Sequence, residues 1–135
     1  MATIRREIPL SAAAADVWDA VRDFGHVHTR LAPGFVVACA LNADASHGMA
    51  RQVTFFNGLQ AREYLVTCDD AARRLVYGAS GGRTTHYNAA VEVQADGTGA
   101  RIVWTIDLLP DSLAEAIGAM VERAAAAMRS ALEAR

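Results

Sequence analysis

The sequence predicts an α+β fold in which a curved antiparallel sheet of seven strands wraps around one long C-terminal helix. Two observations predict it. Apolar residues recur at helical spacing near the start of the chain and again after position 111, whereas between residues 35 and 109 they alternate with a period of two. The long terminal helix must bury its apolar stripe, and the strands are the only large partner. Because a strongly curved sheet cannot contact a helix everywhere, we expect a cavity between them.

The beginning of the chain predicts one strand followed by two short helices. Residues 3–10 alternate loosely between apolar and charged side chains. Ser11 stands where a helix N-cap is expected, because its hydroxyl can accept a hydrogen bond from a free backbone N–H. Residues 12–24 place apolar side chains on one helical face, and residues 26–34 add a short helical turn closed by a Pro-Gly pair.

Six further strands and a final helix complete the predicted fold. The strands are expected at 35–42, 49–56, 60–68, 73–79, 84–95 and 100–109. Connections rich in Asn, Asp and Gly separate them, as is typical of turns. Pro110 and Asp111 then end the last strand and start a helix over residues 111–134. We expect residues 1–135 to form a single domain with its own core.

Composition excludes several classes of function. A formal net charge of −2 gives no basic surface for nucleic acid or for an anionic membrane. No apolar run approaches the ~20 residues that a membrane span requires, and the first ten residues lack the apolar core of a signal peptide. All 13 Lys+Arg residues are arginine, which is typical of a high-GC bacterial genome. We therefore expect a cytoplasmic bacterial protein, as a monomer or homodimer.

Neither a metal site nor a cofactor site is expected. Cys39 and Cys68 lie far apart without the spacing of a metal or redox motif, and we expect them to be reduced. The histidines are spread over different loops without a set of acidic or cysteine partners at ligand spacing. The sequence also lacks the glycine-rich nucleotide-binding motifs and the standard hydrolase motifs.

The order of these elements, together with several motifs, resembles the START / polyketide cyclase / birch-pollen-allergen superfamily, a group of SRPBCC-type proteins with the helix-grip fold. The motifs are "SAAAADVWDAVRDFGHV" from position 11, "GMARQVTF" from 48, "AREYLVTCDDAARRLVY" from 61 and "VWTIDLLPD" from 103. The resemblance covers essentially the whole chain. It implies a cavity for a hydrophobic ligand between the sheet and the last helix.

Two loops are similar to the gate and latch loops of one branch of that superfamily, the plant abscisic-acid receptors. "NGLQ" (57–60) stands at the gate, and "GGRTTHYN" (81–88) stands at the latch. The resemblance implies that these loops close the cavity mouth, with Tyr87 turned inward below the latch. The lysine that binds the ligand in those receptors corresponds to Val37, and the gate proline to Gln60, so a hormone-receptor role is not implied.

Three polar residues are candidates for chemistry in the cavity. Glu63 shares its parity with apolar neighbours that, by the resemblance, face inward, and burial of a carboxylate raises its pKa toward acid–base use. The alternative is that Glu63 forms an ion pair. His86 in the latch is a second candidate proton carrier, or else a solvated loop residue. Arg51 is expected either to bind a ligand oxygen or to pair with an acid.

The remaining lining is expected to be apolar. Aromatic side chains of inward parity face small residues on the last helix, and this combination leaves volume for a ligand. With Arg51 and Glu63, the predicted ligand-binding residues are Phe35, Val37, Phe55, Leu59, Tyr77, Tyr87, Ala89, Ile117, Met120, Val121 and Ala124. Asp107 faces opposite to Trp104 on the last strand, and we expect it to point outward.

The leading interpretation is a protein that binds a small hydrophobic or aromatic molecule, such as a lipid, in this cavity. The alternative is an enzyme of the polyketide cyclase/dehydratase type, in which Glu63 or His86 would move protons during ring closure and loss of water. A third possibility is a protein-interaction module, which would need an exposed apolar patch.

Overall fold

A computed structural model describes residues 1–133 of the chain, and its strands follow the predicted pattern closely. The strands are β1 (Ala2–Leu10), β2 (Val36–Asp44), β3 (Gly48–Phe55), β4 (Gln60–Asp69), β5 (Arg74–Ser80), β6 (His86–Asp96) and β7 (Gly99–Leu109). The helical segments are α1 (Ala14–Arg22), the π-helical turn η1 (Val27–Leu31), the 3-10 turn η2 (Asp111–Leu113) and α2 (Ala114–Glu133). The predicted last residue of the final helix, 134, lies outside the described residues.

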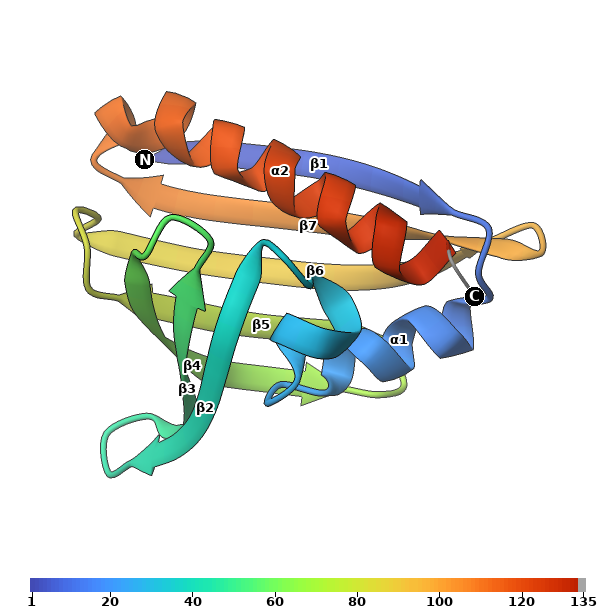
Figure 1. Cartoon of the computed structure of the whole chain (residues 1–135), viewed down its shortest axis with the longest axis horizontal. Helices are drawn as coiled ribbons and strands as arrows, with labels where there is room; N and C mark the ends of the chain where they lie inside the picture. Colours follow the sequence, from blue (N-terminus) through green and yellow to red (C-terminus); the bar gives the residue numbers. More distant parts are fainter. Residues whose placement is uncertain (134–135) are drawn as a thin grey trace.

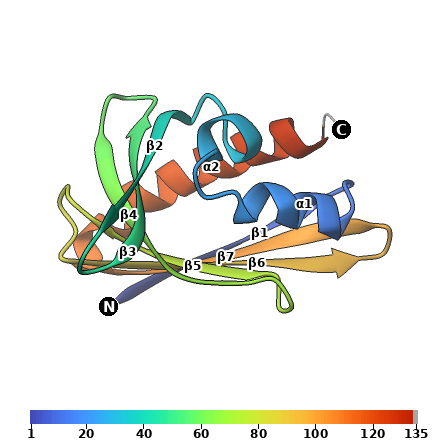
Figure 2. The ribbon, with the colours of Figure 1, turned by 90° about the horizontal axis from the view of Figure 1, so that it is seen from below.

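The strands form one antiparallel sheet in the order β1-β7-β6-β5-β4-β3-β2. In Figure 1, α2 runs along β1 and β7, and α1 and η1 lie between β1 and β2 in the chain. Figure 2 shows that β2, β3 and β4 bend away from the plane of the other strands, so that the sheet folds around α2. The predicted fold class, a seven-stranded curved sheet around a long C-terminal helix, is confirmed.

Contacts with two residues attach α2 to the start of the chain: Arg6 on β1, and Ser11 directly after β1. Arg6 on β1 donates a hydrogen bond to Glu122 near the middle of α2. At the far end of the helix, Glu133 accepts hydrogen bonds from the hydroxyl and from the backbone N–H of Ser11, the latter at 2.9 Å. These bonds from Ser11 lower the pKa of the Glu133 carboxyl.

The predicted capping role of Ser11 is therefore wrong. The N-cap position of α1 is Ala13, whose side chain offers no hydrogen bond. Ser11 lies two residues too early to reach the first turn of α1, and its hydroxyl bonds to Glu133 of α2 instead. The helix is also shorter than the predicted 12–24.

Helix α1 is fixed to the turn between β4 and β5 through one carboxylate. Asp70 accepts a hydrogen bond from Trp18 Nε1 at 2.9 Å and one from Arg22 Nε at 2.8 Å. The bond from Arg22 and then that from Trp18 lower the pKa of Asp70. Trp18 thus has its indole N–H satisfied.

The largest fully buried side chains lie mainly on β1 and β7, with one each on α1, α2 and β3. They are Ile8, Ile102, Ile106, Leu108, Leu132, Val17 and Val53. Cys39 and Cys68 do not form a disulfide with one another. Within residues 1–133, no helix is long and apolar enough to cross a membrane, and no group of His, Cys, Asp and Glu side chains could hold a metal ion.

Candidate ligand-binding site

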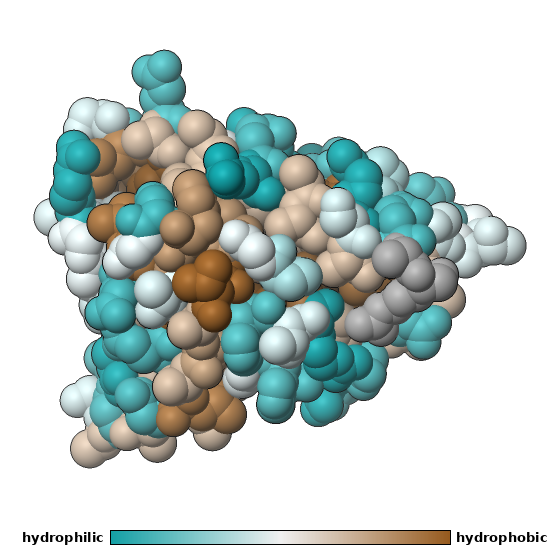
Figure 3. All heavy atoms as spheres, in the orientation of Figure 1, coloured by the Kyte–Doolittle hydropathy of each residue, from teal (hydrophilic) through white to brown (hydrophobic). Residues whose placement is uncertain are grey.

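A cavity of about 320 Å³ lies in the bend of the sheet, between α1 and η1, the strands β2 to β7 and α2. This volume is at the lower end of the range of small-molecule pockets. Most of its lining is apolar: Val21, Val27, Leu31, Phe35, Val36, Phe55, Leu59, Leu75, Val91, Leu113, Ile117, Met120 and Met128. Figure 3 shows apolar side chains gathered on the outer face over the same region, where α2 approaches the β3–β4 loop.

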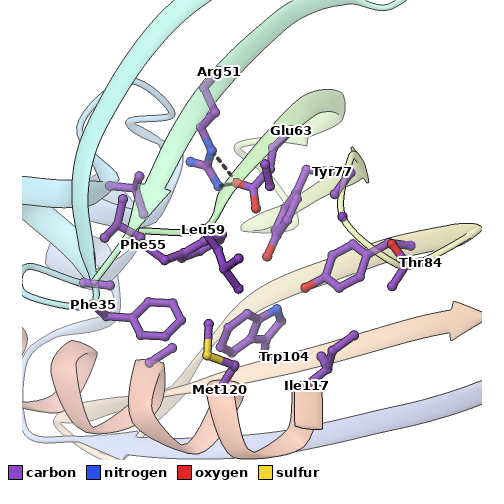
Figure 4. Close-up of a pocket in the computed structure, with 18 of the residues that line it drawn as sticks. Phe35, Arg51, Phe55, Leu59, Glu63, Tyr77, Thr84, Trp104, Ile117 and Met120 are labelled. Carbon is purple, nitrogen blue, oxygen red and sulfur yellow. Dashed lines mark hydrogen bonds and ion pairs between the residues drawn. The ribbon is translucent and has the colours of Figure 1, made fainter. Parts of the chain in front are cut away.

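An ion pair is set into the wall formed by β3 and β4. Arg51 and Glu63 are direct neighbours across the two strands, and their exposed fractions are only 6% and 7%. Arg51 Nε and Nη2 each lie 2.7 Å from Glu63 Oε1. Arg51 Nη1 also donates to the backbone oxygen of Phe24 at 3.0 Å, and the guanidinium lies 3.9 Å from the centre of the Phe24 ring. The two charges therefore balance within the wall (Figure 4).

Two tyrosines on β5 and β6 and a tryptophan on β7 bring polar atoms to the cavity. The rings of Tyr77 and Tyr87 are 6.2 Å apart. Burial strongly raises the pKa of both hydroxyls, and the nearby Glu63 carboxylate raises them further. Both tyrosines are therefore neutral hydrogen-bond donors at physiological pH. In Figure 4 the hydroxyl of Tyr77 points toward the ring nitrogen of Trp104 across the space beside Leu59.

The Trp104 indole nitrogen is buried without a hydrogen bond. The side chain is 6% exposed, and Nε1 has no hydrogen-bond partner of normal geometry within residues 1–133. An unsatisfied buried donor costs roughly 1–3 kcal/mol. Trp18, the other tryptophan of the chain, pairs its indole with Asp70, so the two indoles differ in this respect.

The loop between β3 and β4 borders the cavity and contacts α2. Its turn is closed by a bond from Phe55 N to Leu59 O at 2.8 Å, and Gly58 has a φ of 86°, a value that favours glycine. Phe56 packs beside Phe35, with ring centres 5.9 Å apart. The guanidinium of Arg123 on α2 lies 3.9 Å from the centre of the Phe56 ring. The loop is thus held to the helix by one cation–π contact.

The loop between β5 and β6 borders the other side of the cavity. Gly81, Gly82, Arg83 and Thr84 all contribute to the lining. The two glycines have φ values of 94° and 73°, and a β-carbon at either position would meet no atom within 4 Å. A larger side chain would fit at either position, so glycine is favoured here because of the positive φ angles alone.

The structure places ten of the predicted ligand-binding residues in the lining. They are Phe35, Arg51, Phe55, Leu59, Glu63, Tyr77, Tyr87, Ile117, Met120 and Ala124. Ala89 and Val121 lie on inward faces, but they are packed into the core and do not border the cavity. The ligand-binding roles of all these residues stay predictions.

Two expected site residues, Val37 and His86, lie outside the cavity. The pairing of β2 with β3 shifts between Val36 and Ala38, and this bulge leaves the side chain of Val37 54% exposed. His86 is exposed as well, because it precedes the inward-facing Tyr87 on a strand whose side chains alternate between faces. Neither residue is among those that line the cavity.

Trp104 is the most important lining residue that the sequence analysis did not assign to the site. It shares its parity on β7 with the buried Ile102, Ile106 and Leu108. That parity was a usable signal for an inward position. Asp107 has the opposite parity and accepts a hydrogen bond from Thr3 Oγ1 at 2.6 Å, in agreement with the outward orientation that we expected.

A family model described as "Polyketide cyclase / dehydrase and lipid transport" matches residues 1–134. The chain belongs to the polyketide cyclase / dehydrase and lipid transport family. This confirms the resemblance to the START and birch-pollen-allergen superfamily. No curated protein sequence matches this family member.

Several solved structures are similar in fold to this polyketide cyclase / dehydrase family protein. A solution NMR structure from Thermobifida fusca is 33% identical, with a TM-score of 0.74 over 98% of this chain and 91% of that one. A START superfamily protein from Mycobacterium smegmatis is 13% identical, with a TM-score of 0.78 over 98% and 97% of the two chains. Norcoclaurine synthase from Thalictrum flavum is 19% identical, with a TM-score of 0.69 over 97% and 93%. The last two show likeness of fold alone.

Proposed function

We propose that this family member binds a small hydrophobic or aromatic molecule, such as a lipid, in the cavity between the sheet and α2. The observation that carries the proposal is the cavity itself, which measures about 320 Å³ and has a lining of apolar side chains with few polar groups. Ligand pockets combine these features, since apolar walls supply affinity and a few fixed polar atoms set orientation.

The two flanking loops would control entry to the cavity. The β3–β4 loop and the β5–β6 loop both contribute lining residues, from Leu59 and from Gly81 to Thr84. The glycines of both loops tolerate backbone angles that other residues resist. This arrangement supports the gate and latch roles that the sequence resemblance implies.

The enzyme alternative has less support from the site. A cyclase or dehydratase needs a proton carrier that reaches the substrate. The carboxylate of Glu63 is already paired with Arg51 at 2.7 Å, and His86 is exposed outside the lining. We therefore favour binding over proton transfer by these two residues.

The proposal is tested with N-phenyl-1-naphthylamine, an uncharged dye whose fluorescence rises in apolar surroundings. We expect saturable binding to the folded protein and displacement by hydrophobic molecules. Ala61→Phe, which places a ring in the cavity from β4, should abolish binding while the circular dichroism spectrum stays unchanged. Ala40→Phe, at an exposed position on β2, is the matched control and should bind normally.

Two further results complete this test. Native mass spectrometry of protein purified from its source should reveal a bound small molecule. Dye that binds only as the protein unfolds, or binds Ala61→Phe and the parent protein equally, would contradict the proposal.

A further inference from the structure

One buried hydrogen-bond donor of the cavity lacks a protein partner of normal geometry. It is the indole Nε1 of Trp104, whose side chain is 6% exposed and which makes no hydrogen bond of normal geometry within residues 1–133, although the Tyr77 hydroxyl lies near it. Figure 4 shows this nitrogen pointing into the cavity toward the hydroxyl end of Tyr77. A buried donor in a ligand pocket is satisfied when the ligand brings an acceptor.

The hydroxyls of Tyr77 and Tyr87 reinforce this donor. They enter the cavity from β5 and β6, the strands that continue the sheet beyond β7, with their rings 6.2 Å apart. Both phenols are protonated at neutral pH, and burial raises the pKa of each further above its ordinary value of about 10. Two neutral hydroxyls and one indole N–H thus converge from three adjacent strands.

The charges around the cavity favour a neutral acceptor over an anion. The carboxylate of Glu63 lines the cavity near Tyr77 and its charge is balanced by Arg51 at 2.7 Å. A ligand carboxylate would find no unpaired buried cation among residues 1–133 to compensate its desolvation. Arg83 also lines the cavity, but its side chain is exposed on the β5–β6 loop, where solvent screens its charge.

We infer that Tyr77, Tyr87 and Trp104 form an anchor for a neutral oxygen acceptor, the carbonyl group of a ketone, ester or amide, on an otherwise apolar ligand. This inference rests on the proposed function and names the chemical class of its ligand. The apolar body fills the space between Phe35, Phe55 and Met120, and the carbonyl oxygen accepts hydrogen bonds from the anchor.

The test compares 2-acetylnaphthalene with 2-isopropenylnaphthalene, which has nearly the same shape but carries a methylene group in place of the carbonyl oxygen. By calorimetry, the ketone should bind about tenfold more tightly, although the alkene is the more hydrophobic of the two. Tyr77→Phe and Tyr87→Phe should each weaken ketone binding about tenfold and leave alkene binding within about twofold. Tyr64→Phe, on the outer face of β4, is the matched control and should change neither.

The NMR signals of the indole N–H groups provide a second test, in which none of the three anchor residues is substituted. The chain has two tryptophans, and Trp18→Phe identifies their indole N–H signals. On addition of the ketone, the Trp104 signal should move downfield as its N–H gains an acceptor, whereas the Trp18 signal, already bonded to Asp70, should stay in place. The alkene should leave the Trp104 proton without this downfield shift.

Three outcomes would overturn the inference. Equal affinities for ketone and alkene, with no downfield shift of the Trp104 signal, would remove the anchor and leave hydrophobic binding intact. Tighter binding of 2-naphthoate than of the ketone would show that the site prefers an anion. Failure of both naphthalenes to bind would remove the proposed function together with the anchor.

Discussion

Arg51 and Glu63 show how a charged pair is retained inside an apolar wall. Moving either ion out of water alone would cost several kcal/mol. The pair recovers this cost through the contact at 2.7 Å, the bond from Arg51 to the Phe24 carbonyl oxygen and the packing of the guanidinium on the Phe24 ring. Each charge is therefore compensated only while the other is present.

Glu63→Gln should reduce the free energy of unfolding by about 3–5 kcal/mol, because it leaves the guanidinium of Arg51 buried without a counter-charge. Urea unfolding at neutral pH measures the loss. Replacing both residues, as Arg51→Met with Glu63→Leu, should recover much of it, since no charge then remains buried. A loss below about 1 kcal/mol in Glu63→Gln would show that solvent reaches the pair.

Single residues also show where sequence reasoning reaches its limit. The inward position of Glu63 follows from strand parity, but parity does not reveal that Arg51 lies opposite it, because strand register depends on the whole sheet. Val37 was misplaced because a bulge between Val36 and Ala38 breaks the alternation. A bulge adds one residue to the strand, and every later side chain therefore points to the opposite face from the one that simple alternation predicts. No particular residue type is required for a bulge, so the sequence alone does not reveal it.

At the scale of elements, α1 depends on Asp70 in the β4–β5 turn for its attachment. The hydrogen bonds from Arg22 and Trp18 keep the folded-state pKa of Asp70 below its ordinary value of about 3.9. The stability from this contact is therefore fully present above that ordinary pKa and is lost as the pH falls toward the lower folded-state value.

Asp70→Asn should lower stability at neutral pH and flatten its decline between about pH 5 and pH 2, because the carboxyl that must be protonated is gone. Urea midpoints measured across this range test the expectation. Asp96→Asn is a suitable control, since this acid makes no hydrogen bond or ion pair with another side chain in the described part of the chain. Identical pH profiles for Asp70→Asn and the parent protein would contradict the prediction.

The β3–β4 and β5–β6 loops beside the cavity should each become less mobile when a ligand binds. Backbone amides at 57–60 and 81–87 should exchange with solvent rapidly in the free protein, since few buried contacts hold these turns, and more slowly with a bound ligand such as 2-acetylnaphthalene. Hydrogen exchange followed by mass spectrometry gives both rates. Amides of β7 serve as the internal reference, and unchanged loop rates at saturating ligand would argue against a lid.

At the scale of the whole molecule, the alternation of strands and the spacing of the last helix were sufficient to predict the fold class. Both patterns arise from local geometry that every residue of an element shares. The cavity was predictable in outline for a related reason, since it follows from curvature. The placement of its polar groups was harder to predict from the sequence. The exposure of His86 and the unpaired indole N–H of Trp104 depend on how separate elements pack together.

Helix α2 behaves, in mechanical terms, as a beam clamped toward one end. Its C-terminal end is embedded through Ala125 and Leu132, which do not line the cavity, and is tied by the contact of Glu133 with Ser11, whereas Ile117 and Met120 in its N-terminal half are only half-buried over the cavity. A small tilt about this C-terminal end would therefore enlarge the cavity beneath Ile117 and Met120. We expect bulkier occupants to be accommodated by this tilt, which spin labels at the exposed Ala116 and at Ala40 would register as a longer distance.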